Sequence, residues 1–368
     1  MLPIALKSFH IKNYRGIIDT QIDNIPDNTQ WIFLTGENGF GKTSVLQALA
    51  QGFLPSKFLQ ENKVVYTHNS FPFENGNSPF LNLKEGKTEA VFKKSIVGYG
   101  SARLKSSDDE KDVLQYGGYS SLFSTTTLFR MDMLFKNWYK EYPEGKQRLE
   151  LIFKTLLPNV NSIEVEFNNT NKLLEVKYYE KDGEGYSYNE GVPFDQLAAG
   201  YRNIIGMIGD MIFRLSLEQD VEDYKDLEGI VLIDEIELHL HPKYQKLFVE
   251  KLTELFPKIQ FIVSTHSPIP LLGAPKNSVI INVSRTKEEG IKAELLDIDF
   301  SVLTPNTILS SPIFGFQDLI PDSKSNDKMI RTEDTYKEVL FHDQLDKQID
   351  EFLTEENKQE LLDLLKVK

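Results

Sequence analysis

Eight consecutive residues from Gly36 to Thr43 match the phosphate-loop pattern G-x-x-x-x-G-K-[ST]. In such a loop, successive backbone N–H groups and the N-terminus of the next helix converge on a polyanion. Glycines are needed because a Cβ would keep the backbone away from phosphate. We expect Lys42 to place its charge between the β- and γ-phosphates, and Thr43 to offer its hydroxyl to Mg²⁺. The stretch therefore predicts a nucleoside triphosphate site, with a glycine-rich turn of no function as the alternative.

The residues that flank this loop predict the strand and the helix that the site requires. Residues 31–35 are a continuous apolar run, typical of a strand. After the loop, apolar residues recur at helical spacing as far as Gly52, the expected end of the helix. We expect the nucleotide to contact the whole loop and the residue after it, namely Gly36, Glu37, Asn38, Gly39, Phe40, Gly41, Lys42, Thr43 and Ser44.

A second acidic element is needed to hold Mg²⁺ and to activate water. Residues 230–233 are apolar, as in a strand that is buried on both faces, and Asp234 and Glu235 follow directly. This is the Walker B arrangement, in which Asp234 binds Mg²⁺ together with Thr43 and Glu235 polarises the attacking water. The alternative is a strand that ends in two solvated acids.

Three of the histidines that follow these acids lie within the next 35 residues, up to His266. His266 comes just after the next apolar run, residues 259–263, where it is expected to sense the γ-phosphate; a hydrogen-bonded polar residue at a strand end is the alternative. With Lys42 and Glu235 it completes the predicted catalytic set. His239 and His241 share a face of an extended segment, and with Glu237 they could also suit zinc, although no third imidazole or cysteine has a clear claim.

Composition limits the class of protein. The chain has 368 residues with 55 Asp and Glu against 41 Lys and Arg, and this net charge of −14 disfavours non-specific nucleic-acid binding. No cysteine is present, which excludes disulfides and thiolate sites. Nowhere do about 18 apolar residues run together, and the N-terminus lacks an apolar signal segment. We expect a soluble cytoplasmic protein that does not enter a membrane.

Hydrophobic periodicity predicts an α/β chain. Its expected strands cover residues 4–12, 17–23, 90–97, 230–233, 259–263 and 279–283, with a hairpin formed by 162–179 and 185–188 around Asp182-Gly183. Helices are expected within 120–158, interrupted by residues 143–145, then from Gly200 to about Leu217, from Pro242 onward, and as two helices within 335–366. Residues 54–86 are expected to be a long loop, and the polar run 105–112 to be mobile.

Taken together and in this order, the motifs resemble the ABC-type ATPases of the SMC/RecF branch. More closely, they resemble the small bacterial ATPases of overcoming-lysogenisation and Septu-like phage-defence systems. The resemblance covers residues 1–285. It rests on 13–15 (Asn-Tyr-Arg), 36–43, 98–103 (Gly-Tyr-Gly-Ser-Ala-Arg), 197–202 (Leu-Ala-Ala-Gly-Tyr-Arg), 233–242 and 264–268 (Ser-Thr-His-Ser-Pro).

The resemblance implies that two copies sandwich ATP between the phosphate loop of one and a Leu-Ser-x-Gly signature of the other. Leu197 and Gly200 match that signature, whereas Ala198 replaces its serine and removes a hydroxyl contact. Backbone N–H groups at the start of the helix can still face the phosphate, and Arg202 can supply charge. Glu237, His239 and His241 would then be structural residues or contacts to the second copy.

The fold implied is an α/β P-loop NTPase of ABC/RecF-like type, with a mixed central sheet, a helical lobe and a short helical C-terminal tail. We expect the head to comprise 1–103 and 197–300, with an inserted lobe and hairpin at 104–196 and a tail at 301–368 as a docking segment. The implied activity is hydrolysis of ATP with Mg²⁺ by a homo-dimer or larger homo-oligomer. That assembly would regulate a separate effector, such as a nuclease, in anti-phage defence.

Three other functions remain open at this stage. The chain could be a RecF-like DNA-repair ATPase that contacts nucleic acid, which DNA-stimulated turnover would indicate. It could be a weakly hydrolysing, nucleotide-gated scaffold, because Ala198 weakens the signature. It could also be the ATPase subunit of a transporter, which the opening strand and the segment from Leu238 to Pro242 disfavour.

Overall fold

A nine-stranded mixed sheet organises the part of the chain that the computed structural model describes. The order of its strands is β4-β1-β2-β13-β12-β3-β11-β10-β5. The described residues are 2–52, 65–66, 95–103, 105–107, 118–170, 172–181, 190–217, 219, 221–297 and 314. The predicted fold class, an α/β P-loop NTPase with a mixed central sheet, is confirmed.

The parallel half of the sheet is made by β5 (Ile96–Tyr99), β10 (Gly229–Ile233), β11 (Ile259–Ser264), β3 (Trp31–Thr35) and β12 (Val279–Thr286). Every residue of β3, β5, β10 and β11 is buried. Strands buried on both faces require continuous apolar runs, and such runs were the signal in the sequence.

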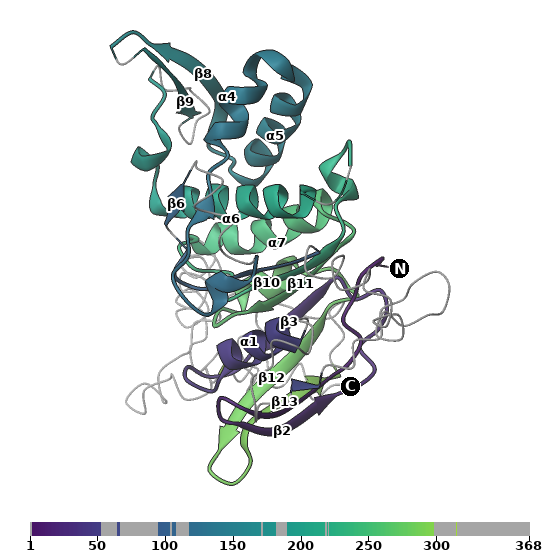
Figure 1. Cartoon of the computed structure of the whole chain (residues 1–368). Coiled ribbons are helices and arrows are strands. Elements are labelled where there is room, and N and C mark those ends of the chain that lie inside the picture. Colours follow the sequence, from purple (N-terminus) through teal and green to yellow (C-terminus); the bar gives the residue numbers. More distant parts are fainter. Residues whose placement is uncertain are drawn as a thin grey trace, which may run out of the picture. The chain divides into compact units, whose positions relative to one another are not determined.

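Helices cover both faces of these strands (Figure 1). Alternate side chains of one strand enter two different cores: Trp31 and Phe33 belong to one cluster, and Ile32 and Leu34 to the other. The first cluster includes residues of α6 (Ala199–Ser216) and α7 (Pro242–Leu255), and the second includes α1 (Lys42–Gly52). The sheet therefore fixes the helix that follows the phosphate loop and the two helices of its other face.

Helix α6 is buried along most of its length, as its apolar sequence predicts, but it carries a buried acid. The Asp210 carboxylate accepts hydrogen bonds from Tyr99 Oη (2.9 Å), Arg214 Nε (2.8 Å) and the backbone N–H of Phe129 (2.8 Å). Burial raises the pKa of Asp210, and the Arg214 guanidinium opposes that shift. These bonds tie α6 to β5 and to the short strand β7.

The antiparallel half contains β4 (Val65–Tyr66), β1 (Phe9–Tyr14), β2 (Ile17–Ile22) and β13 (Gly290–Leu296). Strand β1 begins later than the predicted 4–12. Strand β13 was missed altogether, because no sequence signal marked it beyond β12.

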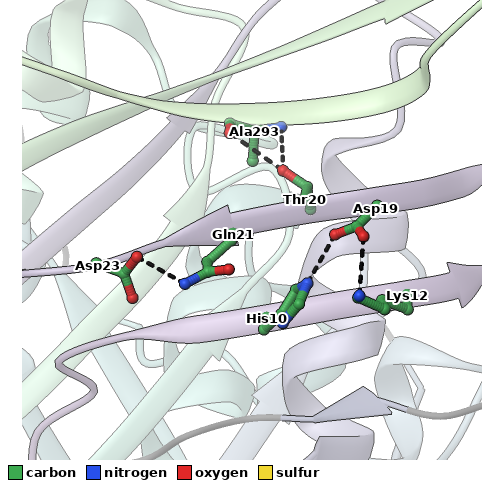
Figure 2. A network of polar contacts seen from close by, with 7 residues as sticks. All are labelled: His10, Lys12, Asp19, Thr20, Gln21, Asp23 and Ala293. Carbon is green, nitrogen blue, oxygen red and sulfur yellow. Dashed lines mark hydrogen bonds and ion pairs between the residues drawn. The ribbon is translucent and has the colours of Figure 1, made fainter.

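One side chain adds two hydrogen bonds to the junction of β2 and β13 (Figure 2). Thr20 Oγ1 donates to the carbonyl of Ala293 (3.1 Å) and accepts from its N–H (2.9 Å). On the exposed part of the hairpin, Asp19 pairs with His10 Nε2 (2.7 Å) and Lys12 Nζ (3.0 Å) across the strands. Strands β2 and β13 pair as a ladder at Gly290 and Ile17, and the buried Thr20 hydroxyl links the same two strands at Ala293.

Residues 118–196 add short strands, two helices and a separate hairpin. The elements are η3 (Ser120–Leu122), β7 (Leu128–Phe129), α4 (Asp132–Glu141), α5 (Pro143–Leu156), β8 (Val160–Asn168), β9 (Leu173–Glu180) and η4 (Phe194–Gln196), and β7 pairs with β6 (Ser106–Ser107). The remaining short helices are η5 (Tyr224–Asp226) and η6 (Ile269–Gly273). The four-segment division expected for the chain remains a prediction.

Two details of this region differ from the sequence prediction. The predicted single strand 162–179 is itself a hairpin: β8 and β9 pair across a turn between Asn168 and Leu173, where Asn168 Oδ1 accepts from the N–H of Thr170 (2.8 Å) and Lys172 adopts φ 59°. The expected turn at Asp182-Gly183 and the strand 185–188 lie outside the described residues. Pro143 does not separate two helices by a loop but opens α5 at its first turn, where a missing N–H is tolerated.

Several predicted segments lie outside the described residues. These are most of the loop 54–86, the start of the strand expected at 90–97, part of the run 105–112, and the helices at 335–366. Within the described part of the chain, no helix has the length and apolar character needed to cross a membrane.

The Thr20 bridge yields a stability prediction. Thr20→Val keeps the shape of the side chain but leaves the N–H and C=O of Ala293 without their partner, so the free energy of unfolding should fall by about 1–3 kcal/mol. Thr20→Ser, which retains the hydroxyl, should lose less. Chemical denaturation of the three proteins measures this difference, and an unchanged midpoint for the valine variant would show that β13 does not depend on the bridge.

Candidate functional site

The phosphate loop is shaped by close packing against the neighbouring strands β12 and β13. Gly36 and Gly41 have φ angles of 130° and 100°. A Cβ on Gly36 would lie 2.1 Å from the carbonyl oxygen of Val283 in β12, and one on Gly41 would lie 2.4 Å from Ile291 Cδ1 in β13. These glycines are therefore required by the protein's own packing as well as by the approach of phosphate.

Lys42 is the buried cation of the loop, with 4% of its surface exposed. Its ammonium donates to the carbonyl oxygens of Gly36 (2.6 Å) and Glu37 (3.0 Å). Burial lowers its pKa to about 8, against the opposing charges of Glu237, Asp234 and Glu235. Because both acceptors are carbonyls of the phosphate loop, the loop itself fixes the position of the ammonium.

Thr43 and Asp234 meet directly. Thr43 Oγ1 donates to Asp234 Oδ2 at 2.8 Å, and Ser264 Oγ donates to Asp234 Oδ1 at 2.5 Å. The backbone N–H of Glu235 in turn donates to Ser264 Oγ at 2.8 Å. The structure thus brings together the two predicted metal ligands. It also reveals Ser264, whose role could only have been inferred from its place at the end of the adjacent strand.

Arg103 holds the main chain of Asp234 and Glu235. No signal in the sequence predicted this role. Its side chain is 1% exposed, and its guanidinium donates to the backbone carbonyls of Asp234 (2.6 Å) and Glu235 (2.8 Å). It also donates to Asn203 Oδ1 in α6 at 2.8 Å. Burial lowers the pKa of Arg103 to about 10, and Asp234, Glu235 and Glu237 oppose this shift.

Glu235 occupies a conformation that is uncommon for a residue with a side chain. Its φ is 50°, in the left-handed region, and its main chain is held there by the bonds from Ser264 and Arg103. Such conformations concentrate at functional sites, where the surrounding structure maintains them. The strand thus ends in a turn whose main chain is fixed at Glu235, the predicted base.

His266 lies near the same charges. Burial lowers the pKa of its imidazole, Lys42 lowers it further, and the strongest opposing charge is Glu237. The ring is therefore neutral at pH 7 and can donate one hydrogen bond and accept another. The backbone N–H of His266 donates to Glu237 Oε1 at 2.6 Å, so the Glu237 carboxylate lies next to His266.

The signature residues lie apart from this cluster, on a cavity of about 170 Å³. Ala198 precedes α6, and a Cβ on Gly200 would lie 2.6 Å from the carbonyl oxygen of His239, so only glycine permits this approach. His239, Tyr244 and other residues of the segment after the Walker B acids complete the cavity wall.

The histidine pair has other roles than the zinc alternative suggested. His241 Nδ1 accepts from the N–H of Lys243 (3.3 Å) at the start of α7. His239 supplies the carbonyl that faces Gly200. Among the residues that the structure describes, no three His, Cys, Asp or Glu side chains are grouped to hold a metal ion.

Comparisons with known proteins agree with these motifs. A family model described as an AAA ATPase domain matches residues 125–269. The Septu protein PtuA of Bacillus mycoides (strain KBAB4) is 29% identical over 343 residues, which cover 86% of this chain and 46% of that protein. The Retron Vc95 probable ATPase of Vibrio cholerae serotype O1 biovar El Tor is 41% identical over 117 residues, 30% of this chain and 20% of that one.

Among solved structures, the SMC head domain from Thermotoga maritima is similar, with 15% identity and a TM-score of 0.43. The matched region covers 80% of this chain and 100% of the SMC head domain chain. The sequence relatives confirm the resemblance to ABC-type ATPases of the SMC/RecF branch and to small phage-defence ATPases. The chain spans less than half the length of the Septu relative.

The buried ammonium gives a test of the site. Lys42→Ala should remove most ATP affinity and leave the fold intact, because it deletes a charge on a pre-formed loop. Calorimetric titration of ATP, with circular dichroism as the control for folding, measures this. Wild-type affinity in the variant would place the nucleotide elsewhere.

The lowered pKa of Lys42 also predicts a pH dependence. Bound phosphates favour the charged ammonium and raise its pKa above the value of about 8 in the free protein, so ATP binding should take up a proton at alkaline pH. ATP affinity should be constant below pH 7.5 and then fall, by up to about tenfold per pH unit above the free pKa. Lys42→Arg, which stays charged, should show a flat profile, and a flat wild-type profile would contradict the prediction.

Proposed function

We propose that this chain binds and hydrolyses ATP as an ABC-type ATPase. The observation that carries the proposal is the 2.8 Å bond between Thr43 and Asp234, which joins residues 191 positions apart. A threonine hydroxyl and a carboxylate are the hard oxygen ligands that Mg²⁺ prefers. Thr43 and Asp234 would hold the ion, and Lys42 with the loop N–H groups would bind the phosphates.

The residues present fit both groups. The ammonium of Lys42 is bonded to carbonyls of its own loop, which phosphate oxygens can replace as acceptors. Both oxygens of Asp234 already receive hydroxyl donors, so the carboxylate is oriented before a ligand arrives. When bound, the magnesium ion draws negative charge from the phosphate oxygens.

The proposed reaction is in-line attack of water on the γ-phosphorus. The new bond forms between the water oxygen and phosphorus, and the bond to the β–γ bridging oxygen breaks, which releases ADP and phosphate. Glu235 accepts the proton of the water, Lys42 balances charge on the leaving oxygen, and the neutral His266 donates to the γ-phosphate. Ser264 and Arg103 keep the main chain of Glu235 in place during the step.

Hydrolysis is proposed to require a second copy, whose signature would complete the site. The first turn of α6 offers backbone N–H groups and the positive end of a helix. Arg202 adds a buried Nε that has no hydrogen-bond partner within the described residues. Ala198 offers no hydroxyl there, which favours weak ATP-driven association. The assembly would be a homo-dimer or a larger homo-oligomer.

We further propose that the ATPase senses or regulates infection through a separate effector, such as a nuclease, in anti-phage defence. Similarity to a Septu protein and to a retron ATPase supports this role. A weakly hydrolysing, nucleotide-gated scaffold is a second candidate, favoured by Ala198, and turnover near background would support it. Turnover stimulated by DNA would instead favour a RecF-like repair ATPase.

Glu235→Gln separates chemistry from assembly. Glutamine has nearly the same shape but cannot accept the proton, so turnover should fall about a hundredfold or more while ATP binding persists. The variant should then accumulate as an ATP-dependent dimer, because binding energy is no longer released by hydrolysis. Phosphate release and light scattering, with and without Mg-ATP, measure both properties.

Two outcomes would revise this scheme. Wild-type turnover in Glu235→Gln would remove this residue from the mechanism. An inactive variant that stays monomeric at millimolar ATP would keep the catalytic role and discard the ATP-gated sandwich. Glu254→Gln, an exposed change on α7, is the matched control and should behave as wild type.

A further inference from the structure

Glu237 is an acid of the nucleotide site to which neither the motifs nor the proposed reaction assigns a role there. It lies in the tight turn after the Walker B acids, where the N–H of Leu240 donates to its carbonyl at 2.9 Å. One carboxylate oxygen, Oε1, accepts the backbone N–H of His266 at 2.6 Å. The other, Oε2, is buried and has no hydrogen-bond partner within the described residues.

The two neighbouring acids, Asp234 and Glu235, make different contacts. Both oxygens of Asp234 receive hydroxyl hydrogen bonds, from Thr43 and Ser264. Glu235 is fixed through its main chain and is the proposed base. Glu237 is thus the acid that combines an anchor on His266 with a vacant, buried acceptor.

The hydrogen bond from the His266 N–H places this carboxylate beside a residue that is proposed to bind the terminal phosphate. Glu237 is also the leading acid acting on His266. Because Coulomb energy falls with distance and rises with burial, a carboxylate that is bonded to the His266 main chain and has one buried oxygen acts on the imidazole.

We propose that Glu237 is a positioning residue that holds His266 beside the terminal phosphate and weakens ATP binding relative to ADP binding. This inference rests on the proposed nucleotide site, not on hydrolysis itself. The bond to the His266 N–H fixes the main chain that carries the imidazole. The negative carboxylate repels the γ-phosphate, which only ATP carries, and Oε2 can accept from a water of the nucleotide's hydration shell.

Two variants separate the two functions of the side chain. Glu237→Gln keeps an oxygen acceptor for the N–H of His266 but removes the charge. Glu237→Ala removes both. Glu289→Gln, on the exposed turn between β12 and β13, is the matched control for a change of one surface charge. Circular dichroism and thermal unfolding establish that each variant is folded.

The measurements use nucleotide affinity and a spectroscopic signal, so they do not require turnover. Calorimetry with ADP and with a non-hydrolysable ATP analogue gives the two affinities. NMR titration of the His266 imidazole in the nucleotide-free protein, assigned with His266→Gln, gives its pKa. The backbone amide resonance of His266 reports the anchoring hydrogen bond.

In Glu237→Gln we expect the analogue to bind about three- to thirtyfold more tightly, with a smaller change for ADP. The pKa of His266 should fall further below its usual value, because the charge that raised it is gone. The amide resonance of His266 should stay in place in this variant and shift in Glu237→Ala. Turnover, where wild type shows it, should fall about tenfold in Glu237→Ala, which loses the anchor on His266, and by less in Glu237→Gln, which keeps it.

Equal or weaker binding of the analogue by Glu237→Gln would overturn the proposal, as would an unchanged pKa of His266. A merely structural residue would lower affinity for both nucleotides alike and would be rescued by glutamine. Failure of the proposed function has another signature. In that case wild type would not turn over ATP, or Lys42→Ala would not affect binding, whereas the His266 signals would still report on Glu237.

Discussion

Two buried cations and three acids share one small region, and the charge balance among them is the constraint on which the site depends. Lys42 and Arg103 are 4% and 1% exposed, and burial lowers the pKa of both. An unpaired charge in the interior is costly, so cations there need nearby negative charge. Asp234, Glu235 and Glu237 supply it, since all three act on each cation. The acids to which the chemistry is assigned are thus among those whose negative charge favours the charged forms of Lys42 and Arg103.

The site forms where the two halves of the sheet meet. Strand β3 delivers the phosphate loop between β12 and β11, and β10 beside β11 delivers Asp234. The loop packs against both halves, through Val283 in β12 and Ile291 in β13. The loop conformation is therefore determined by strands more than two hundred residues later in the chain. Local sequence supplies the glycines, and tertiary packing supplies the reason for two of them.

Sequence alone predicted the parallel strands, the helices that follow them and the loop, because each carries a strong local signal. Continuous apolar runs mark β10 and β11, and residue type with spacing marks Lys42, Thr43 and Asp234. It could not predict Arg103 or Ser264, because their roles arise from contacts across strands. The hairpin between β8 and β9 was missed, because residues 162–179 were predicted as one strand and the turn signal at Asn168 was not used. Strand β13 was missed because its conformation is fixed by pairing with β12 and β2 and not by a strong local signal.

The position of Arg103 has a mechanical consequence. Its planar guanidinium binds the carbonyls that follow β10 and, through Asn203, the first turns of α6, while Asn203 also donates to the carbonyl of Leu238 (2.9 Å). A side chain with this many fixed bonds leaves little play between the elements it joins. Arg103 and Asn203 thus join the turn after β10 to the start of α6, the helix that Ala198 precedes. Loss of the one guanidinium would remove the support of the main chain at Asp234 and Glu235 and the connection to that helix at the same time.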